Sequence, residues 1–137
     1  MSEANEELEK DIIYVGNEKF VPMITEEKLQ QRIAELGKQI TEEYKTKLPI
    51  FIGVLNGSFM FLADLLKNVD LHCEMDFFKL SSYGDNKISS GNVKLLKELN
   101  ADISERHVII VEDIVDSGLS ITYIRAVSYT HLTLPTN

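Results

Sequence analysis

The chain has 137 residues, of which 44% are hydrophobic and 26% charged, a composition that predicts one globular domain with its own core. Its formal net charge of −8 argues against general nucleic-acid binding, which needs a basic surface. No apolar run is long enough to span a membrane, and the acidic N-terminus lacks the basic start of a signal peptide. The single cysteine, Cys73, excludes an internal disulfide and favours a cytoplasmic location.

The N-terminal part of the chain is predicted to serve packing. Residues 1–11 form a frayed acidic leader, and residues 12–15 are a short strand candidate before a turn at 16–18. A helix is expected from Thr25 to Lys45, because apolar side chains recur there every three or four residues and Thr25 can serve as the N-cap. Gly37 is expected to weaken this helix by about 1 kcal/mol relative to alanine.

The next segment has the pattern of the first half of a β-α-β unit. Residues 49–55 predict a buried strand, which is followed by a polar turn at Asn56-Gly57-Ser58 and an apolar helix over 59–66. Ligands bind outside the carboxyl ends of the strands in open parallel sheets. Asn56 and Gly57 are therefore binding candidates, although an Asn-Gly pair after a strand is more often an ordinary turn.

A long polar segment separates the two strands that follow. Residues 73–80 and 93–96 have strand composition, while residues 81–92, which include Ser82 and Tyr83, are rich in serine, glycine and asparagine. A polar segment of this length in a compact domain indicates either a disordered loop or a lid over a ligand.

The segment from His107 to Ser120 carries the strongest chemical signal. An apolar strand over 108–111 ends in Glu112 and Asp113, which point to opposite faces because they are strand neighbours. Asp116 then opens a turn of small residues over 117–120, where backbone N–H groups and a helix N-terminus can bind phosphate. A strand that ends in acids is often only a strand that meets water. Acids for sugar hydroxyls or a metal beside a phosphate cradle nevertheless favour a phosphorylated sugar as the ligand.

The sequence Val111-Glu-Asp-Ile-Val-Asp-Ser-Gly118 resembles the signature of the type I phosphoribosyltransferases, and most of all the hypoxanthine or hypoxanthine-guanine phosphoribosyltransferases. The resemblance implies an α/β fold with a central, mostly parallel sheet flanked by helices. It implies purine salvage, in which the 5-phosphoribosyl group of phosphoribosyl pyrophosphate (PRPP) passes to hypoxanthine or guanine, giving IMP or GMP and pyrophosphate. Mg²⁺ as cofactor and a homo-oligomer, either a dimer or a tetramer, are also implied.

The resemblance assigns roles to the acids. It implies that Asp116 is the general base that takes a proton from the purine, and that Glu112 and Asp113 hold the ribose hydroxyls and the shell of Mg²⁺. The expected 5′-phosphate contacts are Ser117, Gly118, Leu119 and Ser120. The family usually has lysine or another polar residue in place of Leu119 and threonine in place of Ser120, so backbone N–H groups and the retained hydroxyl would make these contacts.

Two other segments share the family's patterns. Val54 to Phe59 is similar to the loop that contacts the pyrophosphate of PRPP, which implies binding by Asn56 and Gly57 and a cis peptide bond before Asn56. The family usually has lysine or arginine in place of Asn56. Ser82 and Tyr83 resemble the Ser-Tyr pair of the family's flexible catalytic loop, which favours the lid for residues 81–92.

The resemblance ends near residue 126. Residues 1–126 are expected to form a partial phosphoribosyltransferase domain, incomplete at its C-terminal end, without the family's base-binding lysine and aromatic residue and its second metal-binding aspartate. Residues 127–137 are rich in threonine, contain Pro135 and predict an extended tail outside the family, so His131 receives no role.

Two other functions are compatible with these motifs. One is a regulatory relative that binds PRPP or nucleotides and then RNA without turning over purine, which the acidic composition disfavours and salt-dependent RNA binding would support. The other is an unrelated α/β domain whose acids only bind metal. Mg²⁺ affinity that does not respond to PRPP would favour that second alternative.

Overall fold

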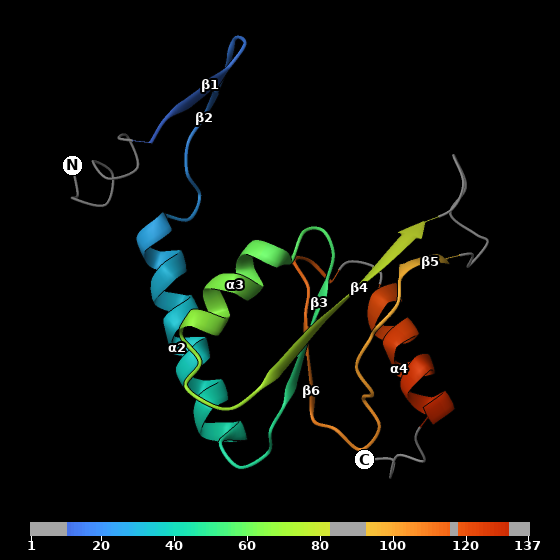
Figure 1. Ribbon diagram of the computed structural model, residues 1–137. Helices are drawn as coiled ribbons and strands as arrows, with labels where there is room; N and C mark the ends of the chain where they lie inside the picture. The colour runs from blue at the N-terminus through green and yellow to red at the C-terminus, as the bar shows by residue number, and fades with distance from the viewer. Residues whose placement is uncertain (1–10, 83–92, 116–117, 132–137) are drawn as a thin grey trace.

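The computed structural model describes residues 11–82, 93–115 and 118–131. Its first element is a hairpin of β1 (Ile13–Val15) and β2 (Glu18–Phe20), which turns at Gly16 with a φ of 61°. The predicted strand is present, but β2, whose three residues pair only with β1, was not predicted. The hairpin stands away from the rest of the fold, beyond the N-terminal end of the first helix (Figure 1).

Helices α2 (Glu26–Tyr44) and α3 (Phe59–Lys67) follow the predicted boundaries closely. Thr25 caps α2 as expected, because its hydroxyl oxygen accepts a hydrogen bond from the N–H of Lys28 at 3.3 Å. Gly37 has a packing role that helix propensity does not show. A Cβ at Gly37 would lie 2.7 Å from the Cβ of Asn68, so glycine allows α2 to approach the end of α3 closely.

A four-stranded sheet forms the centre of the fold, in the order β5-β4-β3-β6. Its strands are β3 (Ile50–Val54), β4 (Glu74–Ser82), β5 (Val93–Lys97) and β6 (Val108–Val111). β3 pairs in parallel with β4 and β6, while β5 runs antiparallel to β4, which confirms the mostly parallel sheet. The polar segment was expected to begin at Ser81, but Ser81 and Ser82 extend β4, because they pair with β5.

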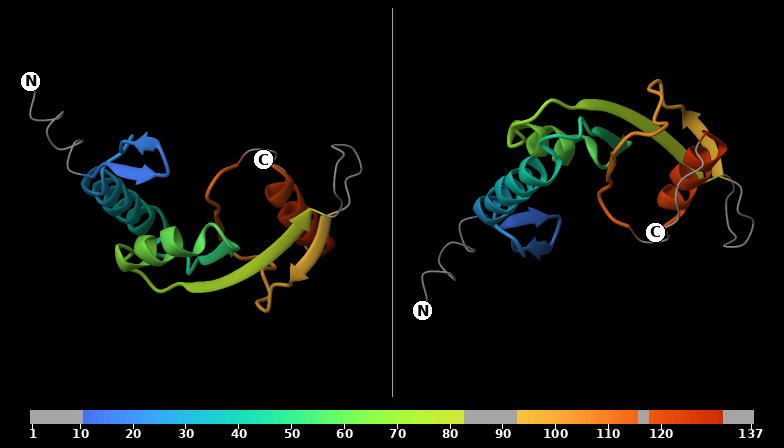
Figure 2. Two further views of the ribbon diagram at one scale, coloured as in Figure 1. Left: turned by 90° about the horizontal axis from the view of Figure 1, so that it is seen from above. Right: turned by 90° about the horizontal axis from the view of Figure 1, so that it is seen from below.

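Hydrophobic clusters cover both faces of the sheet. On one face, Phe51 and Val111 pack with buried residues of α2 and α3; on the other, Ile50 and Ile52 belong to a cluster that includes Ile124. All five residues of β3 are buried, as the sequence predicted for a central parallel strand. Figure 2 shows the long arc of β4 running from α3 toward the last helix, α4 (Leu119–His131). The loops that follow β3 and β6 therefore leave the same edge of a sheet whose two faces are both packed.

Helix α4 extends from Leu119 to His131. The expectation that the helical pattern ends at residue 126 is wrong, since residues 127–131 continue the helix. Threonine and β-branched residues cost only fractions of a kcal/mol each in a helix, and extending a helix already nucleated and anchored by the buried Ile124 is easier than starting one. No described helix is both long and apolar enough to cross a membrane.

Candidate functional site

The loop after β3 is held tightly from both sides. Its peptide bond between Leu55 and Asn56 is cis, as the resemblance implied. The N–H of Leu55 donates to the carbonyl of Phe78 in β4 at 3.0 Å, and the hydroxyl of Ser58 donates to the carbonyl of Val54 at 2.6 Å. Ser58 is fully buried, so this bond satisfies a hydroxyl that water cannot reach. This supporting role of Ser58 was not predicted; its place between a buried strand and an apolar helix is the signal that could have indicated it.

Gly57 lies directly against Asp113, which follows the neighbouring strand β6. A Cβ at Gly57 would lie 2.6 Å from the Cγ of Asp113 and would also overlap its Oδ2. Only a glycine therefore permits this approach of the two loops. Asp113 is exposed, and its Oδ1 accepts a hydrogen bond from the N–H of Ile114 at 2.8 Å. The structure thus brings together one predicted pyrophosphate contact and one predicted acid.

Glu112 provides the second carboxylate of this edge. The residue is half-buried, and its Oε2 is buried with no hydrogen-bond partner among the described residues. Leaving a buried carboxylate oxygen unpaired costs about 1–3 kcal/mol or more, so such an oxygen marks a place for a donor from a ligand. A sugar hydroxyl or a water molecule of a hydrated cation would supply that donor.

The acids fit Mg²⁺ bound through its substrate and waters. The described residues contain no group of three or more histidine, cysteine, aspartate or glutamate side chains that could hold a metal by themselves. Mg²⁺ usually keeps several waters and binds through one or two carboxylates together with phosphate oxygens. The unpaired oxygen of Glu112 and the exposed carboxylate of Asp113 match this mode of binding.

The start of α4 has the geometry of an anion site. Gly118 has a φ of 69°, a conformation that favours glycine, and its carbonyl accepts bonds from both the N–H and the hydroxyl of Thr122 at 3.0 Å. Leu119 and Ser120 form the first turn of the helix, whose N–H groups and dipole favour a phosphate. The other residues predicted for the site add no geometry. Asp116, Ser117 and Tyr83 lie outside the described residues, and Ser82 is described only as the last backbone position of β4.

A mostly parallel sheet that has a close loop-to-loop contact, two acids and a helix N-terminus at its carboxyl edge is an arrangement typical of α/β proteins that bind ligands at this edge. The model of the "Phosphoribosyl transferase domain" matches residues 23–127. The chain therefore belongs to the phosphoribosyltransferase family.

Individual relatives show which members of this family the chain resembles. The chain is 46% identical over 102 residues to a hypoxanthine-guanine phosphoribosyltransferase of Bacillus subtilis, covering 74% of this chain and 57% of that protein. It is 42% identical over 118 residues to the enzyme of the same name from Streptococcus thermophilus, covering 86% of this chain and 62% of that protein. The crystal structure of a hypoxanthine phosphoribosyltransferase from Staphylococcus aureus aligns with a TM-score of 0.73 at 34% identity, covering 94% and 66% of the two chains.

These comparisons confirm the resemblance inferred from the motifs. The chain spans about three fifths of the length of the two curated relatives. None of these relatives supports the alternative of an RNA-binding regulator, because the names they carry are those of purine phosphoribosyltransferases.

The contact between Gly57 and Asp113 leads to a test of the site. Gly57→Ala should weaken binding of PRPP in the presence of Mg²⁺ by about tenfold or more, because the new Cβ must displace either the loop or the carboxylate. Titration calorimetry measures this affinity. Gly16→Ala is the control, since its Cβ meets no atom within 4 Å and the strain of an alanine at a φ of 61° falls on the hairpin, which is remote from the sheet edge. Equal affinities of the Gly57 variant and the parent protein would show that the approach is not needed for binding.

Proposed function

We propose that this chain binds PRPP at the carboxyl edge of its sheet and serves the transfer of the phosphoribosyl group to hypoxanthine or guanine. The packing of Gly57 against Asp113 carries the proposal, because it unites the loop suited to pyrophosphate with an acid suited to ribose or metal. The purine substrates come from the names of the similar proteins. The products would be IMP or GMP and pyrophosphate.

Each part of the edge has a distinct task in this proposal. Backbone groups of Asn56 and Gly57 bind the pyrophosphate, while Glu112 and Asp113 hold the ribose hydroxyls. The 5′-phosphate contacts are the residues at the start of α4 and its preceding turn: Ser117, Gly118, Leu119 and Ser120. Mg²⁺, when bound, offsets the negative charge of the leaving pyrophosphate. Ser82 and Tyr83 would cover the leaving group and exclude water.

The reaction replaces the bond between the anomeric carbon and pyrophosphate by a bond to a purine ring nitrogen. Positive charge develops on the sugar as the leaving group departs, so the acids beside the ribose stabilise the transition state. The ring nitrogen must lose its proton during the transfer. Asp116 would accept that proton as the general base, which leaves a neutral nucleotide base as the product.

The decisive experiment measures pyrophosphate release by the chain with PRPP and Mg²⁺, with and without hypoxanthine or guanine. Release that depends on the purine is the expected result. Release independent of purine would indicate hydrolysis of PRPP instead. Mg²⁺-dependent PRPP binding without release would restrict the proposal to the PRPP-binding part of the site, and the absence of both release and binding would overturn it. RNA binding that weakens with salt would revive the regulatory alternative.

The proposed base gives a second test. Asp116→Asn should lower turnover by about 10² or more, because the amide cannot take the purine proton, while PRPP affinity stays within about twofold. Steady-state kinetics and titration calorimetry give the two quantities separately. An unchanged turnover number would remove Asp116 from proton transfer, and a parallel loss of PRPP affinity would make it a binding residue.

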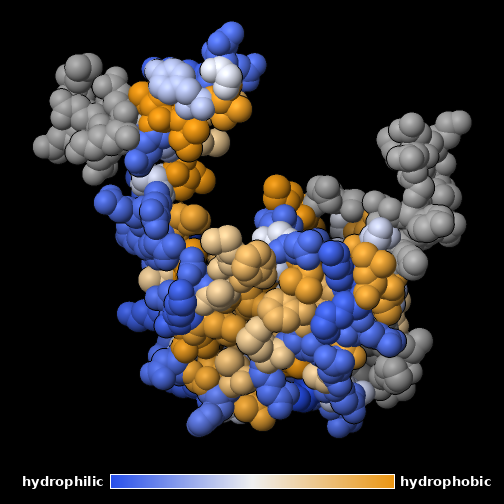
Figure 3. Space-filling view, turned by 45° about the horizontal axis from the view of Figure 1, so that its top comes forward, coloured by the Kyte–Doolittle hydropathy of each residue, from blue (hydrophilic) through white to orange (hydrophobic). Residues whose placement is uncertain are grey.

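Self-association is the last part of the proposal. A hollow of about 450 Å³ between α3 and β4 is lined mostly by apolar side chains, among them the exposed Phe59 and Met75. Figure 3 shows apolar side chains gathered in the middle of the surface, between hydrophilic margins. A patch of this kind favours a second copy of the chain over water. Sedimentation equilibrium should therefore give a dimer or a larger oligomer; a monomer at every concentration would contradict this.

We place the reaction in the cytoplasm, where the free thiol of Cys73 is stable.

A further inference from the structure

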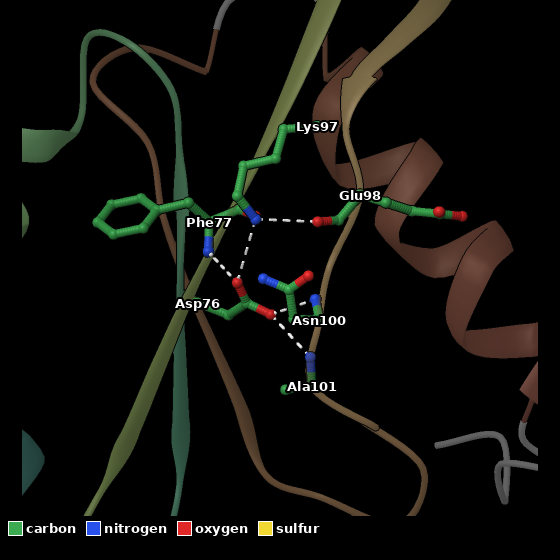
Figure 4. A network of polar contacts seen from close by, with 6 residues as sticks. All are labelled: Asp76, Phe77, Lys97, Glu98, Asn100 and Ala101. Carbon is green, nitrogen blue, oxygen red and sulfur yellow. Dashed lines mark hydrogen bonds and ion pairs between the residues drawn. The ribbon is translucent and has the colours of Figure 1, made fainter.

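Asp76 is a buried carboxylate near the start of β4, between Met75 and Phe77, and it lies away from the proposed PRPP site. Only 8% of it is exposed. Its Oδ2 accepts hydrogen bonds from the N–H groups of Asn100 at 2.6 Å and Ala101 at 2.8 Å, and its Oδ1 accepts from the N–H of Phe77 at 2.7 Å. The ammonium group of Lys97 lies 3.4 Å from Oδ1 (Figure 4). The carboxylate therefore ties β4 to the segment that leads from β5 to β6.

This tie replaces sheet pairing at the point where β5 leaves the sheet. The pairing of β4 with β5 ends at Lys79 and Lys97. Beyond this pair, the backbone groups of the two segments that had faced each other no longer have partners in the sheet. Asp76 accepts from the N–H groups, and Lys97 Nζ donates to the carbonyls of Phe77 at 2.8 Å and Glu98 at 2.9 Å. The two side chains thus act as a pair in which one satisfies donors and the other satisfies acceptors.

The tied segment packs onto the face of the sheet that α4 covers. Ala101 packs against a hydrophobic cluster in which Ile103 and Ile124 are both buried. Ile124 belongs to α4, and the first residues of that helix are the proposed 5′-phosphate contacts. Fixing residues 100 and 101 therefore helps to fix where α4 sits on the sheet. The pyrophosphate loop has other supports, because its bonds run to Val54 and Phe78.

We propose that Asp76 is a positioning residue that sets the place of α4, and thereby the affinity of the site for the 5′-phosphate end of PRPP. The inference rests on the proposed function and adds to it a residue that touches no substrate. It makes the two phosphate subsites separable, since the polar tie supports the one on α4 and not the one on the loop after β3.

Asp76 is suited to this task because it stays ionised. Burial alone raises the pKa of Asp76, but hydrogen bonds from Ala101, Phe77 and Asn100 and the nearby charge of Lys97 outweigh burial and hold its pKa below the usual value. An asparagine at this position would keep the size of the side chain but offer only one oxygen. Its NH₂ group must therefore face either the N–H groups of residues 100 and 101 or the N–H of Phe77 and the ammonium group of Lys97. Donor would then face donor in a buried position.

The test compares two fragments of PRPP on the parent chain and on Asp76→Asn. Ribose 5-phosphate reports on the start of α4, and pyrophosphate with Mg²⁺ reports on the loop after β3. The variant should bind ribose 5-phosphate about tenfold more weakly and pyrophosphate within about twofold of the parent. Asp102→Asn is the matched control, because Asp102 accepts a bond from Ser104 at 2.9 Å within the same segment but is exposed. Its two affinities should stay unchanged.

Hydrogen exchange without ligand gives an independent measurement. The amides of residues 119–124 should exchange faster in the variant, while those of α3 keep the rate of the parent. If Asp76→Asn does not fold, Lys97→Met removes the other half of the tie and should show the same selectivity with a smaller loss. Equal weakening of both fragments, or no change in a folded variant, would overturn the positioning role. A parent chain that binds neither fragment would instead overturn the proposed function, on which this inference rests.

Discussion

The register of β3 against β6 is the constraint on which the site depends. Gly53 pairs with Val111 in the parallel ladder, so the segments that follow β3 and β6 leave the sheet side by side. Gly57 therefore contacts Asp113 a few residues later. A slip of two residues would move Asp113 by about 6.6 Å along the strand, and a slip of one would turn each side chain to the other face. The burial of β3 between two hydrophobic clusters opposes such slips, because each would disrupt the packing of its isoleucine and phenylalanine side chains.

The same alternation separates the two acids. Asp113 lies against the loop that leads into α3, whereas Glu112 continues the row of Val108 and Ile110, which face the cluster shared with α4. A ligand that meets both acids must therefore lie across the edge of the sheet. PRPP carries pyrophosphate at one end of its ribose and phosphate at the other. In the proposed complex, one end would reach the loop before α3 and the other would reach the start of α4.

How far the sequence predicts the structure depends on where each element obtains its stability. Apolar periodicity predicted α2, β3, α3 and β6, because their burial decides their conformation. It missed β2 and the end of β4, since Ser81 and Ser82 are strand residues only through pairing with β5. It also ended α4 too early, because threonines disfavour a helix only weakly once it has begun.

At the site, too, residues in one continuous segment could be predicted, whereas contacts between distant segments could not. The motif from Val111 to Gly118 gave the acids and the turn, because a continuous segment carries them. The supports were missed, because hydrogen bonds such as that of Asp76 with Ala101 join residues far apart in the chain. Asp76 nevertheless left a signal. A carboxylate between the apolar residues Met75 and Phe77 must find partners where the strand is buried, since unpaired buried charges are rarely tolerated.

These supports bear on how a chain with a net charge of −8 would bind a polyanion in the proposed complex. By the resemblance, Asn56 and Leu119 stand where the family usually has cationic or polar side chains, so in the proposed complex backbone N–H groups would carry more of the phosphate binding. A long lysine side chain can adjust to a displaced phosphate, but a backbone N–H moves only with its loop or helix. Small shifts of the loop after β3 or of α4 should therefore cost more here than in a relative with a lysine. Side chains that touch no ligand should therefore affect binding in this chain. Examples are Ser58, which holds the loop after β3, and Asp76, which holds the segment packed against α4.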